Sequence, residues 1–269
     1  MIVQRVPAGE PTIIIRNVDH AVTAGQLARA FGNAQFLVPE PMELMTYVVE
    51  HHEEGWRPLD EAPRRNPLTG LPYHLGETPA DLLIQKSVAS PNWNERRHPW
   101  CGLLSSMHSW GLYNGRYGIS DAITIEARPP AHAAQIEAML EGELARQARL
   151  KEVLRADWST ASWVEKEVLL SSYKLLEFFD TLALWFQLTH AALREPARFR
   201  VPAAEGEDLI LTIEPTGQDT ARISPFPFRE SPIRLRCLVR AITPSEGDAE
   251  FASAMAEAVP FWQSFVLTA

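Results

Sequence analysis

The sequence predicts a mainly helical α+β fold, in which a helical body carries a small antiparallel sheet built from the C-terminal part and an N-terminal hairpin. Apolar residues recur at helical spacing through most of the chain from about residue 19 to residue 193. Beyond Pro196 and Pro202 the pattern changes to short runs rich in Val and Ile, such as residues 233–239. Such alternating runs are typical of half-buried strands.

A β-hairpin is expected at the N-terminus. Residues 2–6 and 12–15 are rich in strand-forming residues, and residues 7–11 between them are typical of a turn. Asp19 is a suitable N-cap for a helix that ends near Phe31, where Gly32 follows as its stop. His20 therefore belongs to the first turn of this helix.

The next helix is expected to begin at the prolines of residues 39–41 and to end at Gly55. The sequence His-His-Glu-Glu of residues 51–54 then forms its last turn. Residues 57–80 contain five of the 21 prolines, which predicts a long ordered loop.

The remaining elements follow from the same patterns. Four further helices are expected, at residues 79–89, 99–112, 129–156 and 159–193. The C-terminal part is expected to contain one helix at residues 246–258 and strands at residues 209–213, 221–223, 233–239 and 261–267.

Bulk composition excludes several classes of protein. The net charge of -9 argues against a general nucleic-acid binder, which needs clustered Lys and Arg. Cys101 and Cys237 are too far apart in sequence for a metal-ligand pair, which favours free thiols in a reducing compartment. The chain begins without the pattern of a signal peptide, and the most apolar segment, residues 169–193, contains ionisable residues. We therefore expect a cytoplasmic protein that binds no membrane.

Candidate metal ligands are distributed over four predicted helices. Imidazoles and carboxylates are the groups that bind divalent metals, and they occur at His20, in residues 51–54, at His108 and at Asp180. Asp180 is the clearest, because apolar residues surround it on nearly every helical face. A buried carboxylate is costly unless a metal, a cation or a hydrogen-bond network compensates it. The alternative is an ordinary buried aspartate paired with an arginine.

His52 and Glu53 are adjacent, so they point about 100° apart on a helix and share one metal only near a helix end. The helix dipole disfavours Glu53 and Glu54 in the last turn, which indicates another role for them. The alternative is a solvated helix end, above all for His51. His20 and His108 are equally compatible with capping or core positions. The other histidines are interpreted as loop or surface residues: His74, His98, His132 and His190.

Candidate cations for an anionic ligand are Arg57, Arg64, Arg65 and Lys174, although such residues are most often solvated. The chain has no glycine-rich dinucleotide loop, no Walker-type loop and no nucleophile elbow.

The order His20, His52-Glu53-Glu54-Gly55, His108, Asp180 resembles the HD-domain superfamily of metal-dependent phosphohydrolases. At a finer level the whole chain resembles an uncharacterised HD-like bacterial family filed as a domain of unknown function. The stretches that carry this finer resemblance are residues 19–21, 51–57, 60–63, 67–73, 106–108, 111–113 and 180–184.

The resemblance implies an HD-like helical core over residues 16–195 within a single domain of residues 1–269. Residues 196–269 together with residues 1–15 would form a β-rich subdomain. The implied metal ligands are His20, His52, Glu53 and Asp180, with His108 as a further ligand or phosphate contact and His51 behind the ligands. Two departures stand out: the superfamily has Asp where this chain has Glu53, and its usual Lys after the glycine is absent, although Arg57 is nearby.

The function that this resemblance implies is hydrolysis of a small anionic substrate, a phosphate ester or nucleotide, by a metal-activated water. The expected cofactor is a divalent metal, Fe, Mn, Zn or Ni, and with Fe an oxygenase reaction is conceivable. Glu54 is a candidate base, and Arg57, Arg64 or Lys174 would neutralise developing charge. Two alternatives stay open. One is a metal-free signalling or scaffold protein, in which Asp180 pairs with a protein cation. The other is a helical ligand-binding protein with an apolar pocket near Trp110, Tyr113 and Trp185.

Overall fold

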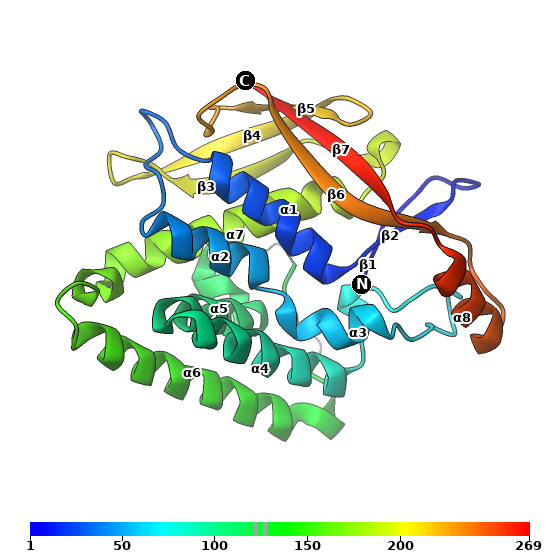
Figure 1. Cartoon of the computed structure of the whole chain (residues 1–269), viewed down its shortest axis with the longest axis horizontal. Coiled ribbons are helices and arrows are strands. Elements are labelled where there is room, and N and C mark those ends of the chain that lie inside the picture. The colour runs from blue at the N-terminus through cyan, green and yellow to red at the C-terminus, as the bar shows by residue number, and fades with distance from the viewer. Residues whose placement is uncertain (121–122, 126–127) are drawn as a thin grey trace.

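One large curved sheet with helices packed against one of its faces makes up the computed structural model, which describes residues 1–120, 123–125 and 128–269 (Figure 1). The sheet has seven strands in the order β1-β2-β6-β7-β5-β4-β3. Neighbouring strands are antiparallel except for the parallel pair β5 and β7. The strands are β1 (Ile2–Val3), β2 (Thr12–Ile15), β3 (Ala197–Pro202), β4 (Asp208–Gly217), β5 (Thr220–Ser224), β6 (Ile233–Ile242) and β7 (Phe261–Thr268).

The predicted fold class is wrong, because the sheet is neither small nor purely antiparallel and the body is not an HD-like all-helical core. Two pairings enlarge the sheet. The N-terminal hairpin joins it through β2, where Ile14 pairs with Arg240 of β6. At the other edge β3 pairs with β4 along its whole length. Strand β3 was not predicted from the sequence, because it is short, directly follows Pro196, and has Arg198 and Arg200 between its apolar residues.

The helices lie between the two strand-forming ends of the chain, with one exception near the C-terminus. They are α1 (Asn17–Ala30), α2 (Met42–His51), α3 (Arg57–Glu61), α4 (Ala80–Arg97), α5 (Pro99–Tyr113), α6 (Ala133–Arg155), α7 (Lys166–Gln187) and α8 (Asp248–Glu257). The expected long loop at residues 57–80 is only partly a loop, because α3 opens it and a 3-10 turn at Leu75–Glu77 lies near its end.

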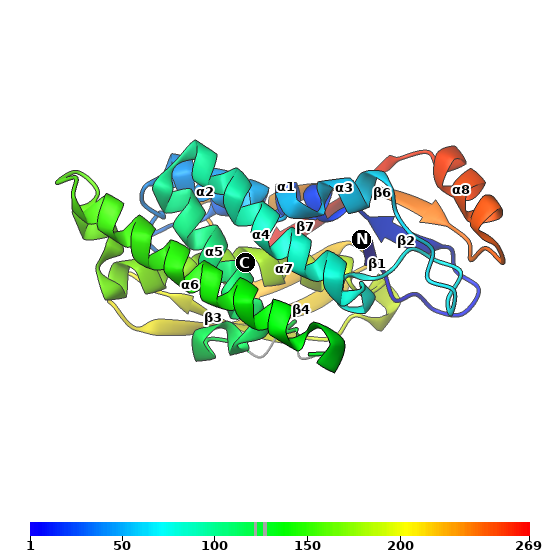
Figure 2. The same ribbon diagram turned by 90° about the horizontal axis from the view of Figure 1, so that it is seen from below.

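The helices form layers on the sheet. Helices α1 and α7 pack directly on it through β6 and β3, and α5 packs on α7 and α2. Helices α4 and α6 pack on α5. Figure 2 shows α6 along the outside of the helical layer and α8 at one end of the molecule. The inner helices α1, α5 and α7 are thus held on several sides, which fixes the direction of their polar side chains.

Aromatic packing fixes helix α7 against the sheet. Phe179 and Phe186 are fully buried, and the Phe186 ring lies 4.7 Å from the ring of Phe265 on β7. The Phe179 ring lies 5.3 Å from Phe31, just after α1. Burying each such side chain contributes about 1.5–3 kcal/mol. Asp180 is therefore carried on one of the most firmly packed segments of the protein.

Among the described residues, no helix is both long and apolar enough to cross a membrane.

Both cysteine thiols are expected to be inert in the native protein. Cys101 and Cys237 are buried, and this burial raises the pKa of each thiol to about 12. Since the thiolate is the reactive form, a disulfide reagent at pH 8 should modify neither thiol in the folded protein and both in denaturant. Rapid modification of the native protein, assigned with Cys101→Ser and Cys237→Ser, would contradict this packing.

Candidate metal centre

Three buried histidines from separate parts of the chain lie close together. His20 lies in the first turn of α1, His52 directly follows α2, and His108 lies on α5. Each Nδ1 is held by an acceptor: 2.6 Å from Gln187 Oε1 for His20, 2.7 Å from the Val49 carbonyl for His52 and 2.9 Å from Glu177 Oε1 for His108. Each Nδ1 therefore donates a proton, and in the neutral form of each imidazole the lone pair is on Nε2.

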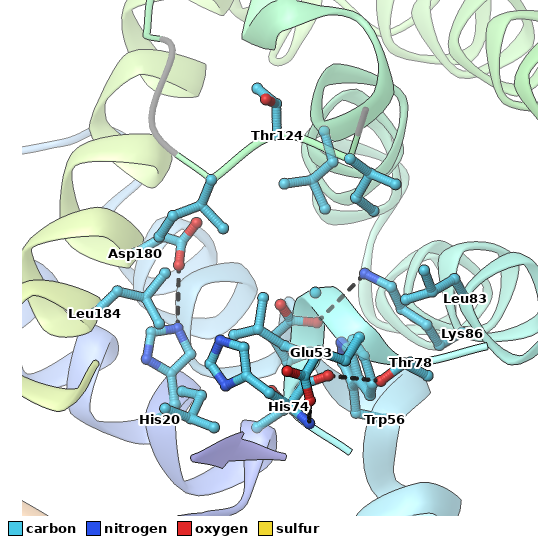
Figure 3. A pocket seen from close by; sticks show the side chains of 18 of the residues that line it. His20, Glu53, Trp56, His74, Thr78, Leu83, Lys86, Thr124, Asp180 and Leu184 are labelled. Carbon is cyan, nitrogen blue, oxygen red and sulfur yellow. Dashed lines mark hydrogen bonds and ion pairs between the residues drawn. The ribbon is translucent and has the colours of Figure 1, made fainter. Parts of the chain in front are cut away.

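The Nε2 atoms of His20 and His52 face the carboxylate of Asp180, and a ring nitrogen of His108 lies within 4.8 Å of a ligand atom of Asp180. Asp180 Oδ1 is 3.1 Å from His20 Nε2 and 3.8 Å from His52 Nε2 (Figure 3 shows the first contact). The Nε2 atoms of His52 and His108 are buried and have no hydrogen-bond partner in the described part of the chain. Lone pairs that face a carboxylate need a positive charge between them, either a proton or a metal ion.

The ligand atoms of His20, His52 and Asp180 lie within 4.8 Å of one another, a spacing that one metal ion can bridge. The rings of His20 and His52 are 5.6 Å apart, and those of His52 and His108 are 5.0 Å apart. The orphaned Nε2 atoms, their fixed tautomers and the adjacent carboxylate fit a divalent ion. Hereafter the metal cluster means His20, His52, His108, Glu53 and Asp180.

Glu53 reaches the metal cluster despite its longer side chain. Helix α2 ends at His51, and Glu53 adopts a non-helical backbone conformation (φ -108°, ψ 18°). The change of direction brings Glu53 Oε1 to 4.0 Å from His52 Nε2. Ligand atoms of His52, Glu53 and His108 also lie within 4.8 Å of one another. Two adjacent three-ligand sets therefore share His52.

Sequence reasoning missed Arg116, which is fully buried beside the metal cluster. Its Nη1 donates to Asp180 Oδ2 at 3.2 Å and forms an ion pair with Glu177, while Nη2 donates to the Ile123 carbonyl. Arg116 has a left-handed backbone (φ 47°), which costs a non-glycine residue roughly 1–2 kcal/mol. Asp180 thus faces a protein cation with one oxygen and histidines with the other.

The electrostatics of the metal cluster favour an added positive charge. Burial opposes ionisation of Asp180, but the His20 and His52 imidazoles beside it and the charge of Arg116 hold its pKa well below the usual range. Burial lowers the pKa of His108, which keeps that imidazole neutral. Burial likewise opposes a proton on His52, yet Asp180 and Glu53 outweigh it and raise the pKa of His52.

The structure does not bring Glu54, Arg57 or Lys174 to the metal cluster. The Glu54 carboxylate accepts hydrogen bonds of 2.8 Å from His51 Nδ1 and from Arg57 Nε and Nη2. Lys174 donates to Asp208 at 2.6 Å and lines a different cavity. The three predicted catalytic residues therefore lie outside the metal cluster, and His51 contacts Glu54 instead of a metal ligand.

Other predicted residues also lie apart from the metal cluster. Arg64 and Arg65 line a separate groove, in which Arg65 pairs with Asp248. The aromatic residues of the expected apolar pocket do not form one site. Trp110 packs on the small apolar cluster that contains Tyr113, whereas Trp185 packs on the main core and meets Phe186 edge-to-face.

Glu54 is expected to contribute to stability, and the substitution Glu54→Gln should lower the free energy of unfolding by about 1–3 kcal/mol. Burial acts against its charge, but the hydrogen bonds from His51 and Arg57 lower its pKa from 4.5 to about 2. Because the folded pKa is depressed, this stabilisation is present above pH 4.5 and is lost as the pH falls towards 2. Urea unfolding at pH 7 and pH 3 tests this, with exposed Glu61→Gln as the control; equal effects of both variants would refute it.

The metal cluster opens into a cavity of about 490 Å³. His20, Asp180, Glu53 and Lys86 of α4 lie on its wall (Figure 3). His108 also lines the cavity. Most of the remaining wall is apolar and comes from several elements, including Ile2, Trp56, Leu83, Leu112, Ile125 and Leu184.

Two further residues of the cavity were not recognised in the sequence. Lys86 is buried, and its Nζ lies 4.0 Å from Glu53 Oε2 and 5.0 Å from the ring centre of Trp56. His74 accepts a hydrogen bond of 3.0 Å from the Val3 backbone N–H at Nδ1, so its proton is on Nε2. Burial lowers the pKa of His74 and favours this neutral form. Neither residue belongs to a sequence motif from which its place in the cavity could be predicted.

The fold and site therefore define an α+β protein with a buried His/carboxylate cluster at a cavity. A family model described as "Protein of unknown function (DUF3891)" matches residues 1–244, and the chain belongs to this family. No curated protein and no solved structure matches the chain. The comparisons do not support the expected relationship to HD domains.

Proposed function

We propose that this protein is a metal-dependent hydrolase that cleaves a small phosphate ester. The observation that carries the proposal is the gathering of three buried histidines around Asp180, beside a cavity that His20, His108 and Asp180 line. His20, His52 and Asp180 would hold a divalent ion, with Glu53 and His108 completing the adjacent set. When bound, such an ion lowers the pKa of a coordinated water and polarises a phosphoryl oxygen.

The residues behind the metal cluster orient it. Gln187, the Val49 carbonyl and Glu177 hold the three imidazoles by Nδ1. Partners of this kind fix the ring orientation and make the opposite nitrogen a better ligand. Arg116 neutralises Glu177 and one oxygen of Asp180 and leaves Asp180 Oδ1 directed at His20 and His52.

The remaining polar groups of the cavity face the substrate. The Lys86 ammonium attracts the anionic group, and the apolar wall excludes water, which strengthens that attraction. His74 offers Nε2–H as a hydrogen-bond donor.

Replacing His74 by Asn and by Gln should separate the contributions of its two ring nitrogens to activity. His74→Asn keeps an acceptor for the Val3 N–H but removes the donor at Nε2, whereas His74→Gln keeps a donor near Nε2. One lost hydrogen bond of about 1 kcal/mol lowers kcat/KM roughly five- to tenfold. We expect this loss in His74→Asn and a smaller one in His74→Gln. The reverse order would show that His74 acts only by holding Val3.

Hydrolysis of p-nitrophenyl phosphate by untagged protein, loaded with Mn, Fe, Zn or Ni, tests the proposal. We expect turnover that a chelator abolishes and added metal restores. Turnover should be lost in His108→Ala and retained in His132→Ala, whose side chain contacts Gln135 away from the cavity. Metal-independent turnover, or none with any of these metals on a panel of phosphate mono- and diesters, would refute the proposal.

A second candidate is a metal-free protein that binds a small anion in the same cavity. The salt bridge of Arg116 with Asp180 and Glu177 favours it, because a protein cation already compensates part of the buried negative charge. The orphaned Nε2 atoms of His52 and His108 favour the hydrolase. Metal content separates the two candidates.

A further inference from the structure

Resting on the proposed hydrolase function, we propose that the substrate carries a single phosphate group on a small apolar body, such as an aryl or short alkyl group. Nucleosides and polyphosphates are excluded by the same cavity. The proposal rests on the juxtaposition of Lys86, the one cation of the described lining without a hydrogen bond, with the metal cluster and a largely apolar wall.

The apolar wall surrounds the cavity from separate elements. Leu83 lies on α4, Leu112 on α5 and Leu184 on α7, and the indole of Trp56 lies beneath the Lys86 ammonium. A cavity of about 490 Å³ lies in the range of sites for small molecules. The body of the substrate therefore meets hydrocarbon over most of its surface.

Two polar side chains that could recognise a nucleobase are already engaged with the protein. Asn17 donates to Asp60, and the Thr78 hydroxyl donates to the His74 carbonyl. Recognition of a base requires several unengaged donors and acceptors, because its polar edge is costly to bury without partners. Within the described lining, the side-chain groups left for a ligand include His74 Nε2–H, the Thr124 hydroxyl and Glu77 Oε1, since only the Oε2 atom of Glu77 accepts hydrogen bonds, from Asn66 and His74.

The charges of the cavity suit one anionic group. The terminal nitrogens of Arg116 bind Glu177, Asp180 and the Ile123 carbonyl, so this guanidinium is engaged. Lys86 makes no hydrogen bond to any described residue, and its nearest carboxylate oxygen is 4.0 Å away. Polyphosphate sites use several cations together with Mg²⁺. One ammonium beside one metal cluster matches a single phosphate.

Glu53 links the ammonium to the metal cluster. Its Oε1 lies 4.0 Å from His52 Nε2, and its Oε2 lies 4.0 Å from Lys86 Nζ. Only the Glu53 side chain therefore separates a phosphate bound by Lys86 from His52. Lys86 thus binds the group that reacts, and the apolar wall selects what is attached to it.

Equilibrium binding to the metal-loaded protein, followed by calorimetry, tests this assignment with inorganic phosphate, AMP, ATP and phenyl phosphate, the last in the form of phenylphosphonate, whose C–P bond is not hydrolysed. We expect phenyl phosphate to bind at least about tenfold more tightly than the other three, because burial of its ring supplies more than 1.4 kcal/mol. Lys86→Met should weaken phenyl phosphate binding about tenfold or more at unchanged metal content, and Lys86→Arg should restore part of it.

A matched pair of leucines on α4 tests the apolar wall. Leu83 and Leu82 are both buried, but only Leu83 lines this cavity. Leu83→Ala should weaken phenyl phosphate binding severalfold and leave inorganic phosphate unaffected, whereas Leu82→Ala should change neither.

Tighter binding of ATP or AMP than of phenyl phosphate would overturn the assignment, as would full affinity in Lys86→Met. Either result leaves the proposed hydrolase function standing if p-nitrophenyl phosphate is still cleaved in a metal-dependent way. If the protein binds no metal, the proposed hydrolase function is refuted instead. Lys86 and Leu83 can then be tested by phenyl phosphate binding to the metal-free protein.

Discussion

Replacing His52 or His108 by alanine is expected to lower the affinity for a divalent metal by about 100-fold or more, since loss of an outer partner alone typically costs 10–100-fold. The Nε2 atom of each histidine is buried and has no partner among the described residues. Neither atom has another evident role, and so alanine should remove a ligand without breaking a hydrogen bond at Nε2. Competition with a metal-sensitive dye measures the change.

The control for these variants is His132→Ala, because His132 contacts only Gln135 through its ring in the described structure. It should bind metal like the wild type. Added metal should raise the melting temperature of the wild type and of this control but not of His52→Ala or His108→Ala. An unchanged affinity in both cluster variants would place the metal elsewhere.

Replacing Arg116 by methionine is expected to lower the free energy of unfolding by about 3–5 kcal/mol, because it leaves buried carboxylates without their cation. Arg116 is fully buried and pairs with both Glu177 and Asp180. Urea unfolding measures the loss. A bound divalent ion supplies positive charge at the same carboxylate, so metal should stabilise Arg116→Met more than it stabilises the wild type.

Arg155→Met is the matched control, since Arg155 forms an exposed pair with Glu152 on α6. Exposed pairs contribute about 0–1 kcal/mol, so this variant should unfold almost like the wild type. Similar effects of both arginine substitutions would show that the Arg116 pairs do not hold the site together.

Local patterns predicted much of the secondary structure. The hairpin of β1 and β2, the helix that carries His20 and the strands β4 to β7 occur near their expected positions. The size of the sheet was not predictable in this way. Strand pairing joins residues such as Ile14 and Arg240, which are far apart in the chain, and no local period encodes that contact. The strand β3 is stabilised by its register with β4 more than by its own composition.

The metal cluster was predictable from residue types, and its surroundings were not. Asp180 stands out as a carboxylate in an apolar helix, and it lies beside His20 and His52 in the structure. Arg116 and Lys86 resemble ordinary surface residues in the sequence, because their burial depends on the packing of several helices. From the sequence, a metal ion and a protein cation were alternative ways to compensate the buried charge of Asp180. The structure gives Arg116 one oxygen and the histidines the other.

Elemental analysis of untagged protein purified without chelator, beside Asp180→Asn, is the most direct test of the metal centre. We predict about one divalent ion per chain or more in the wild type and a large loss in the variant. No metal in either protein, even after reloading with Fe, Mn, Zn and Ni, would contradict the metal centre and leave the Arg116 salt bridges as the compensation for Asp180.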